Sequence, residues 1–220
     1  MSVAFASGAG QVKKVRSRDL IVLVHGLGGN SLWMLPIKWR LVGLGYRCLT
    51  WSYASFRKSI STHGRQLREF LETELAAEKR VHFVAHSMGA IVVRAAVASA
   101  PPENLGRVVF WASPNSGSAA ALAIDRLSRS RFQTISELSS RRDSFVNRLP
   151  VWCGRDLGII AAKFDSVVSL ESTFAINQTD HVIVNATHAG VLFSRQAALQ
   201  TASFLKYGRF RQPLRITYRS

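Results

Sequence analysis

Short apolar runs alternate with longer amphipathic stretches along most of the chain. The first run, Leu20–Val24, is continuous and rich in β-branched residues, which is typical of a strand buried on both faces. By the same criteria we expect five more strands, at residues 46–53, 81–85, 107–113, 157–162 and 181–186. Each run ends near a turn-forming or polar segment, so the pattern predicts six short strands.

The stretches between these runs have helical periodicity. Residues 65–79 place Leu67, Leu71 and Leu75 on one side with charges opposite, and residues 88–100 are apolar nearly all round. Residues 194–208 close the pattern as a helix that Gly208 would end. Strands that alternate with helices predict an α/β fold with a mostly parallel sheet covered on both faces.

The length of 220 residues and the 47% hydrophobic composition favour one domain, expected at residues 19–210. We expect an N-terminal extension at residues 1–18 and a basic C-terminal tail at residues 211–220. Residues 116–150 form a long connection rich in Ser and Arg, with a helical patch at Ala119–Leu127. This connection is interpreted as a lid-like insertion over a site.

The formal charge of +16 is unusual for an enzyme. The basic residues are spread along the chain, and no recognition-helix, RNP, KH or zinc-finger pattern is present, so no specific nucleic acid is expected. Weak contact with an anionic membrane surface stays open. No apolar run is long enough to span a bilayer, and the N-terminus lacks the basic and apolar regions of a secretory signal. A cytoplasmic location is the default expectation, with export through a missed signal as the alternative.

The residues between the third strand and its following helix centre on Ser87, in the stretch "VAHSMGA". A serine on a sharp strand-to-helix turn, flanked by small residues, is typical of a nucleophile elbow, which exposes the hydroxyl at the carboxyl end of a sheet. Gly89 supplies one small residue, and Ala85 stands where glycine is more usual. Ser87 is therefore the candidate nucleophile, and His86 is interpreted as a packing or hydrogen-bonding neighbour.

A serine nucleophile needs a base to accept its proton and an acid to orient that base. In this arrangement the acid and then the histidine follow the serine along the chain. His181 begins a strand, whereas His188 lies in the loop after it and is the candidate base. Asp165 follows the strand at residues 157–162 and is the candidate acid, because the neighbouring aspartates precede strands.

The loop after the first strand, "HGLGGN", combines turn residues with three glycines. The backbone N–H groups of Leu27 and Met88 are the candidate oxyanion-hole donors, since one donor follows the nucleophile and the other comes from this loop. The glycine spacing fits neither a dinucleotide-binding fold nor a P-loop, which argues against nucleotide binding.

Apolar and loop residues around these motifs suggest a hydrophobic acyl pocket. The candidates are His25, Gly26, Leu32, Trp33 and Val191. Leu32 and Trp33 fit the core of the following helix equally well, so both interpretations stay open for them. The two cysteines lie far apart without metal-ligand spacing, and we expect both to be buried apolar residues and no metal site.

Five ordered motifs between residues 20 and 208 carry a family resemblance. They are "VLVHGLGGN", "FVAHSMGA", "SPNSGS", "FDSVVSLES" and "NATHAGVLFS". Together they resemble the α/β-hydrolase superfamily, and most closely its small lipase/esterase branch with an A-H-S-M-G elbow. The resemblance implies a six-stranded core with little or no cap, ester hydrolysis without a cofactor, and the site roles already assigned to the serine, aspartate and histidine.

The resulting hypothesis is a serine esterase, similar to a lipase, that cleaves carboxylic esters of small molecules or lipids through a Ser-His-Asp triad and an acyl-enzyme. A thioesterase, amidase or acyltransferase would use the same triad. A non-catalytic protein that keeps the fold and binds a ligand is an alternative from a different class. The sequence predicts neither the physiological substrate nor the oligomeric state.

Overall fold

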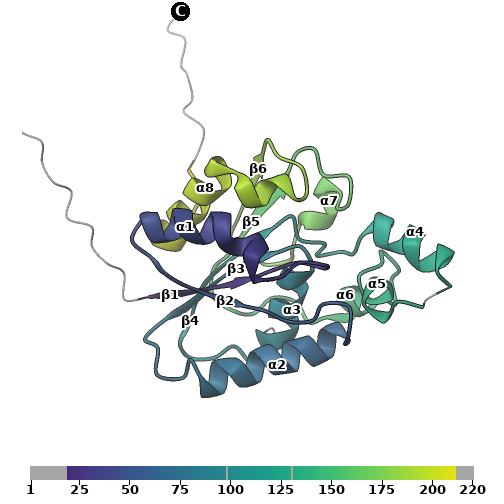
Figure 1. Cartoon of the computed structure of the whole chain (residues 1–220), viewed down its shortest axis with the longest axis horizontal. Helices are drawn as coiled ribbons and strands as arrows, with labels where there is room; N and C mark the ends of the chain where they lie inside the picture. Colours follow the sequence, from purple (N-terminus) through teal and green to yellow (C-terminus); the bar gives the residue numbers. More distant parts are fainter. Residues whose placement is uncertain (1–18, 98, 130, 212–220) are drawn as a thin grey trace, which may run out of the picture.

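Six strands form a single sheet in the order β2-β1-β3-β4-β5-β6, and every neighbouring pair is parallel (Figure 1). The strands are β1 Leu20–Val24, β2 Arg47–Trp51, β3 Val81–His86, β4 Leu105–Trp111, β5 Leu157–Ala162 and β6 Asp180–Val184. The predicted α/β fold and its sheet are thereby confirmed.

The computed structural model describes residues 19–97, 99–129 and 131–211. The extension predicted for residues 1–18 lies outside the described residues, as does all of the tail predicted for residues 211–220 except its first residue. The helices of the described residues are η1 Ser31–Met34, α1 Leu35–Gly43, α2 Ile60–Thr73, α3 Met88–Val97, α4 Ala119–Leu127, α5 Gln133–Glu137, α6 Phe145–Arg148, α7 Leu170–Thr173, η2 Gly190–Phe193 and α8 Arg195–Tyr207. Within that part of the chain, none of these helices combines the length and the apolar character that a membrane span needs.

Two hydrophobic clusters fill the space on either side of the sheet. Helices α2 and α3 pack on one face, and α1 and α8 pack on the other (Figure 1). Alternate residues of β1 divide between the clusters, with Leu20 and Val22 on the α3 side and Ile21 and Leu23 on the α8 side. Because successive side chains of a strand point to opposite faces, a strand covered on both sides must be apolar throughout.

The bounds of α2 and the burial of the cysteines differ from the expectations. Helix α2 spans Ile60–Thr73 and not residues 65–79. It begins earlier because the Ser59 side chain caps it by accepting a hydrogen bond from the Thr62 amide at 3.2 Å, and it ends before Leu75. Cys153 is exposed and Cys48 is half-buried, so the prediction that both cysteines are buried was wrong. Burial of the Cys48 side chain raises the pKa of its thiol to about 12.

The connection between β4 and β5 extends past the carboxyl edge of the sheet and carries α4, α5 and α6 (Figure 1). The predicted helical patch corresponds to α4. Ser118 joins the start of this connection to two other segments. Its amide donates to the Leu138 carbonyl at 2.8 Å, and its hydroxyl donates to the Val167 carbonyl at 2.6 Å. A lid role for residues 116–150 stays a prediction.

Helix α3 begins in direct contact with the carboxyl end of β1, and Gly89 makes this contact possible. A Cβ atom at Gly89 would lie 2.4 Å from the His25 carbonyl oxygen and 2.7 Å from that of Val24. Both neighbours are backbone atoms and have little freedom to move. Any larger residue would therefore push α3 away from β1.

Replacing Gly89 by alanine is expected to lower the free energy of unfolding by about 3 kcal/mol or more, because the added methyl group overpacks a backbone contact. Gly43 is the matched control, since a Cβ there meets nothing within 4 Å. Gly43→Ala should leave stability unchanged or raise it by up to about 1 kcal/mol, as alanine favours helices. Urea denaturation of both variants checks this, and a Gly89→Ala protein as stable as Gly43→Ala would contradict it.

Candidate active site

Ser87 occupies a strained turn between β3 and α3. Its φ angle is +53°, in the left-handed region that residues other than glycine rarely adopt. The Ser87 amide donates to the Trp111 carbonyl at 2.9 Å, and the Ser87 carbonyl accepts from the Ala90 amide at 3.0 Å. Strain of this kind costs about 1–3 kcal/mol and is found mainly at functional sites.

His188 lies in the loop between β6 and η2 and reaches Ser87 from 101 residues away in the sequence. Its Nε2 atom is 3.0 Å from the Ser87 hydroxyl oxygen. The loop is held locally by Thr187, whose carbonyl accepts from the Val191 amide at 3.1 Å and whose hydroxyl accepts from the Gly190 amide at 3.1 Å. The candidate base is thus within hydrogen-bonding distance of the candidate nucleophile.

Asp165 follows β5 and holds the other side of the His188 ring. Its Oδ2 atom is 2.7 Å from His188 Nδ1, and its Oδ1 atom accepts from the amides of Val167 at 2.8 Å and Val168 at 2.9 Å. Burial of the carboxyl group raises its pKa, but these hydrogen bonds outweigh burial and leave the pKa below its ordinary value. An ionised Asp165 requires the proton on His188 Nδ1, so Nε2 is free to accept from Ser87.

His86 supports His188 through a hydrogen bond to its backbone carbonyl. Its Nε2 atom is 2.9 Å from the His188 carbonyl oxygen, and the two rings pack at a tilt with centroids 4.9 Å apart. A carbonyl only accepts, so His86 Nε2 carries a proton and donates it. Burial, with a further contribution from the nearby His188, lowers the pKa of His86 to about 3, so the ring is neutral in the folded protein at neutral pH. The hydrogen-bonding interpretation of His86 therefore has a definite partner.

The loop after β1 approaches Ser87 closely. A Cβ atom at Gly26 would lie 2.9 Å from the Ser87 Cβ, and the loop is fixed where the Gly28 amide donates to the Ser55 hydroxyl at 2.9 Å. Among the described residues, neither the Leu27 nor the Met88 amide donates to an acceptor in a turn, loop or cap. The oxyanion-hole role of the Leu27 and Met88 amides stays a prediction.

His25 belongs to the support of this loop and not to an open pocket. The side chain is 1% exposed; its Nδ1 donates to the Gly26 carbonyl at 2.8 Å and its Nε2 accepts from the Tyr53 amide at 3.3 Å. The His25 ring stacks on Tyr53, whose hydroxyl donates to the His25 carbonyl at 2.9 Å. Burial lowers the pKa of His25. This corrects the interpretation of its side chain as a pocket candidate.

The other pocket candidates divide between core and surface. Val191 is fully buried in the cluster on the α8 face, so its side chain is part of the core, which corrects the pocket interpretation. Leu32 is 66% exposed and Trp33 is 47% exposed, so the core alternative is wrong for both. Neither packs beneath the helix, because Met34 fills the buried position of η1.

Sequence reasoning missed the residues after β2 that support the site, Tyr53 and Ser55. A signal was available, because polar residues directly after a parallel strand lie at the same edge of the sheet as the loop after β1. His181, interpreted as structural, hydrogen-bonds the Thr173 hydroxyl through Nε2 at 2.9 Å, away from the serine. Within residues 19–211 as described, no group of three or more His, Cys, Asp or Glu side chains is placed to hold a metal ion.

Comparison with known proteins identifies the family of the chain. The model of the family described as "Alpha/beta hydrolase family" matches residues 21–201, most of the chain. The chain belongs to the α/β-hydrolase family. No curated protein sequence matches it significantly.

Solved structures resemble this α/β-hydrolase over nearly its whole length. The mature Bacillus licheniformis lipase BlEst2 is 16% identical with a TM-score of 0.70, covering 86% of this chain and 91% of its own. A lipase-esterase related protein from Clostridium acetobutylicum is 15% identical with a TM-score of 0.62, covering 87% and 94%. Aspergillus fumigatus lipase B is 13% identical with a TM-score of 0.71, covering 90% of this chain and 55% of its own. At these identities the likeness shows a shared fold.

The buried state of His86 makes the stability of this α/β-hydrolase depend on pH. The unfolded protein binds a proton on His86 near pH 6.5, whereas the folded protein resists it down to about pH 3. Between these values the unfolded state binds more protons, so the free energy of unfolding falls on acidification, by up to about 1.4 kcal/mol per pH unit from this group. His86→Gln, which keeps an N–H donor but does not titrate, should show a shallower fall in thermal melts from pH 7 to pH 4. An unchanged slope would contradict the assignment.

Proposed function

We propose that the chain is a serine hydrolase that cleaves carboxylic esters through an acyl-enzyme on Ser87. The observation that carries the proposal is the unbroken sequence of contacts from Ser87 to His188 at 3.0 Å and from His188 to Asp165 at 2.7 Å. The three residues come from three separate loops at one edge of the sheet. A serine, a histidine and a buried carboxylate in this order form the arrangement that makes a serine hydroxyl nucleophilic.

In the first half of the reaction, His188 Nε2 accepts the hydroxyl proton as Ser87 Oγ bonds to the ester carbonyl carbon. The carbonyl π electrons move to oxygen, and the amides of Leu27 and Met88 donate to that oxyanion. The oxyanion then re-forms the carbonyl, and the bond to the leaving alcohol breaks as the alcohol oxygen takes the proton from His188. Asp165 stabilises the cationic ring between these two steps.

In the second half, water attacks the acyl-enzyme carbonyl while His188 accepts a proton from it. The second tetrahedral intermediate collapses, Ser87 Oγ leaves and recovers its proton from His188, and a carboxylic acid is released. The strained φ of Ser87 supports this role, because the turn keeps Oγ clear of the backbone on the side that faces His188.

An apolar substrate is favoured by the surface around Ser87. Five large hydrophobic side chains in the loops after β1, β2, β5 and β6 are exposed by 47–66%; we call them the apolar rim: Leu32, Trp33, Phe56, Phe164 and Phe193. Because these loops leave the sheet at the same edge as Ser87, exposed apolar groups on them favour an apolar ligand there. Together with the lipase and esterase names of the similar structures, the rim supports esters with hydrocarbon acyl chains.

Ser87→Ala should abolish turnover of p-nitrophenyl esters and labelling by a fluorophosphonate probe while leaving the melting temperature within a few degrees of wild type. The alcohol is needed for chemistry, and its removal leaves no large cavity. Ser99→Ala, at an exposed serine after α3, is the matched control and should retain both activities. A folded wild-type protein that the probe does not label would contradict the proposal and favour a non-catalytic binding protein.

Asp165→Asn should lower kcat by about 10³- to 10⁴-fold, because an amide at this position favours the wrong tautomer of His188. Asp156 is the matched control, since it lies at the opposite end of the same strand, paired with Arg107 at 2.9 Å. Asp156→Asn should keep activity within about threefold. Steady-state kinetics on esters of increasing acyl length, beside acyl-CoA and amide substrates, measures both variants. Equal losses in the two variants would contradict the role of Asp165, and a preference for thioesters or amides would contradict the ester assignment.

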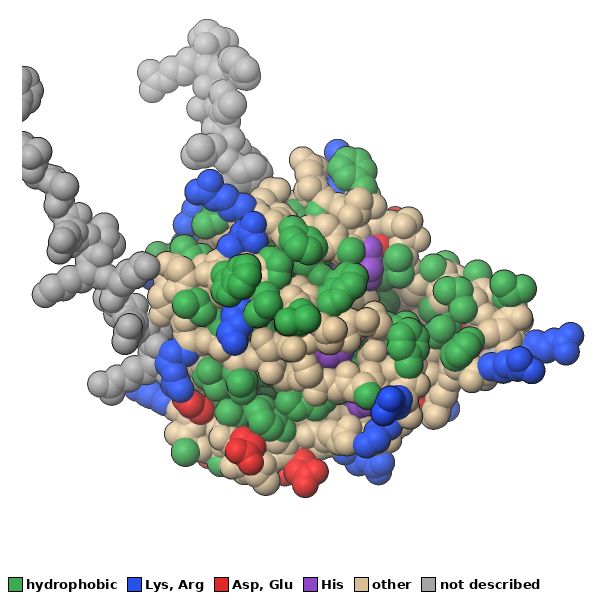
Figure 2. All heavy atoms as spheres, in the orientation of Figure 1, with side chains coloured by type: hydrophobic (Ala, Val, Ile, Leu, Met, Phe, Trp, Pro, Cys, Tyr) green, Lys and Arg blue, Asp and Glu red, His purple; other side chains and the backbone are tan. Residues whose placement is uncertain are grey.

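We also propose that the apolar rim rests on an anionic lipid surface. All 13 acidic residues lie in the described part of the chain, and many gather at the amino ends of the strands, including Asp19, Glu78, Glu103, Asp156 and Asp180. Exposed basic residues adjoin the rim instead: Arg57 and Lys58 follow Phe56, Lys163 precedes Phe164, and Arg195 follows Phe193. Figure 2 shows hydrophobic side chains over α1 and around α4, whereas acidic ones gather over α2.

Replacing Trp33 and Phe193 together by serine should weaken binding to vesicles containing anionic phospholipid by at least about tenfold. Tyr207→Ser is the matched control, because this exposed aromatic residue ends α8 at the opposite edge of the sheet. Vesicle sedimentation across a salt series measures the effect, and binding should weaken as salt rises. Equal binding to zwitterionic and anionic vesicles would contradict the electrostatic part of the proposal.

A further inference from the structure

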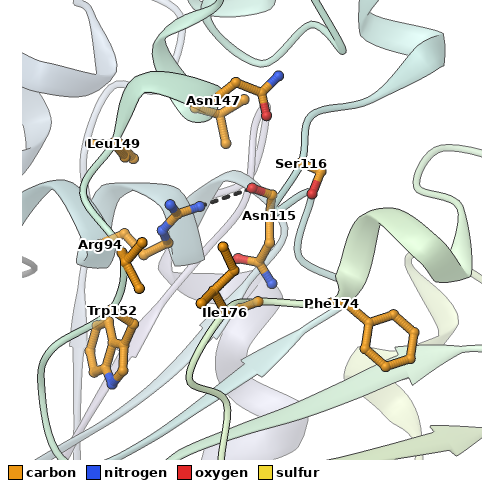
Figure 3. A pocket seen from close by; sticks show the side chains of 11 residues that line it. Arg94, Asn115, Ser116, Asn147, Leu149, Trp152, Phe174 and Ile176 are labelled. Carbon is orange, nitrogen blue, oxygen red and sulfur yellow. Dashed lines mark hydrogen bonds between the residues drawn. The ribbon is translucent and has the colours of Figure 1, made fainter. Parts of the chain in front are cut away.

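A hollow of about 200 Å³ lies on the α3 side of the sheet, apart from Ser87 and its partners. It is bounded by α3, the segment after β4, residues 146–152 and the connection between α7 and β6. Figure 3 shows the Arg94 guanidinium directed toward Asn115, with Leu149 on one side of it and Trp152 and Ile176 on the other. We call this hollow the Arg94 pocket. Seven of its eleven lining residues are apolar, and Arg94 is the one charged residue among the eleven.

Arg94 carries a buried positive charge without a carboxylate partner. The residue is 8% exposed, and its guanidinium donates to two carbonyls, Asn115 at 3.0 Å and Pro150 at 3.4 Å. A guanidinium has five N–H donors, so these contacts use only part of it. All 13 Asp and Glu residues lie within the described residues, and none of them forms an ion pair with Arg94.

This absence of a counter-charge is the reverse of the usual pattern. Arg47 and Arg107 are more exposed, yet each contacts a carboxylate at 2.9 Å. A buried charge normally needs both a partner of opposite sign and full hydrogen bonding. Burial lowers the pKa of Arg94, as expected for a cation that nothing compensates. The charge of Arg94 is therefore unbalanced within the chain.

A second polar group in the pocket is also incomplete. Asn115 is 6% exposed, and its Oδ1 atom is buried without a hydrogen-bond partner among the described residues. The orientation of the amide is fixed, because Nδ2 donates to the Ser113 hydroxyl at 2.9 Å and to the Thr173 carbonyl at 2.7 Å. Arg94 and Asn115 thus line the same hollow, beside the polar residues Ser116 and Asn147 and seven apolar residues. Arg94, with donors to spare, is the group of this pocket that an acceptor ligand can satisfy.

We propose that the Arg94 pocket binds a small monocarboxylate with a short hydrocarbon chain. A carboxylate is planar and accepts two parallel N–H bonds from a guanidinium, which supplies the missing counter-charge. The apolar walls of Leu149, Trp152 and Ile176 suit the hydrocarbon part. Because drug-sized ligands need about 300–1,000 Å³, a hollow of this size admits only a few carbon atoms beyond the carboxylate. The site does not depend on the proposed ester hydrolysis, although a short carboxylic acid is also a product of that reaction.

The test uses sodium butanoate as the probe and the full-length Ser87→Ala protein, so that no catalysis contributes. Isothermal titration at neutral pH should give saturable binding with one equivalent of butanoate, and the indole N–H signal of Trp152 should shift in ¹⁵N NMR spectra. Butan-1-ol and inorganic phosphate, at matched ionic strength, should bind at least tenfold more weakly. The alcohol lacks the charge, and phosphate gains nothing from the apolar walls.

Two variants locate the site. Arg94→Met should weaken butanoate binding at least tenfold, but it also removes two contacts to carbonyls and risks the fold. Ala175→Leu keeps Arg94 and fills the pocket from its wall, so it should abolish binding in a protein that still melts cooperatively. Arg65→Met, at an exposed arginine of α2, is the control and should bind butanoate as the parent does.

Three results would overturn the proposal. They are no saturable binding of butanoate by the folded Ser87→Ala protein, binding that Ala175→Leu leaves intact, and phosphate binding as tight as that of butanoate. Labelling of wild-type Ser87 by a fluorophosphonate is a separate measurement. Failure of the Arg94 pocket and failure of the proposed hydrolysis are therefore distinguishable.

Discussion

The site depends on one backbone contact, in which the first turn of α3 lies against the carboxyl end of β1. Gly89 is so close to the carbonyls of Val24 and His25 that a methyl group would lie 2.4 Å from the nearer oxygen. Gly26 lies similarly close to Ser87, since a Cβ atom at Gly26 would be 2.9 Å from the Ser87 Cβ. These two glycines bring the loop after β1 beside the strained serine. The proposed oxyanion hole of the Leu27 and Met88 amides depends on this approach.

The remaining geometry follows from the parallel sheet. Since all six strands run the same way, the loops that carry Ser87, Asp165 and His188 leave the sheet at one edge. Loops alone would not fix the distances, and buried neutral histidines add the rigidity. His86 holds the backbone of His188, and His25 holds the Gly26 loop together with Tyr53. Both rings are neutral in the fold because burial lowers their pKa, so they act as hydrogen-bonding supports and not as acids.

The pattern of apolar residues was enough to predict the strands, and it is clearest for β1 and β5, which are covered on both faces and buried throughout. β5 was predicted residue for residue. Chain order and strand ends were enough to bring Ser87, Asp165 and His188 together in prediction. A linear pattern does not show which side chains are buried. Val191 and His25 adjoin the site in sequence yet are buried. Leu32 and Trp33 are exposed to solvent, although their sequence suits a helix core. The start of α2 was missed because its cap depends on a single Ser59 hydroxyl outside the periodic stretch.

The positive charges of this chain are of two kinds, the surface basic residues and the buried Arg94. Basic residues exceed acidic residues, and several acidic residues, among them Asp19 and Asp156, lie where strands begin. Arg94 differs, because it follows Ser87 by only seven residues yet lies within the protein, on the helix that the serine begins. An apolar side chain would fill the same position without a desolvation cost. Two carbonyl contacts account for part of the guanidinium, and the unpartnered Asn115 oxygen beside it is not explained by them. A structural link between two loops would not need a hollow beside the guanidinium, whereas a buried cation without a carboxylate partner at a partly apolar hollow suits an anionic ligand from outside the chain.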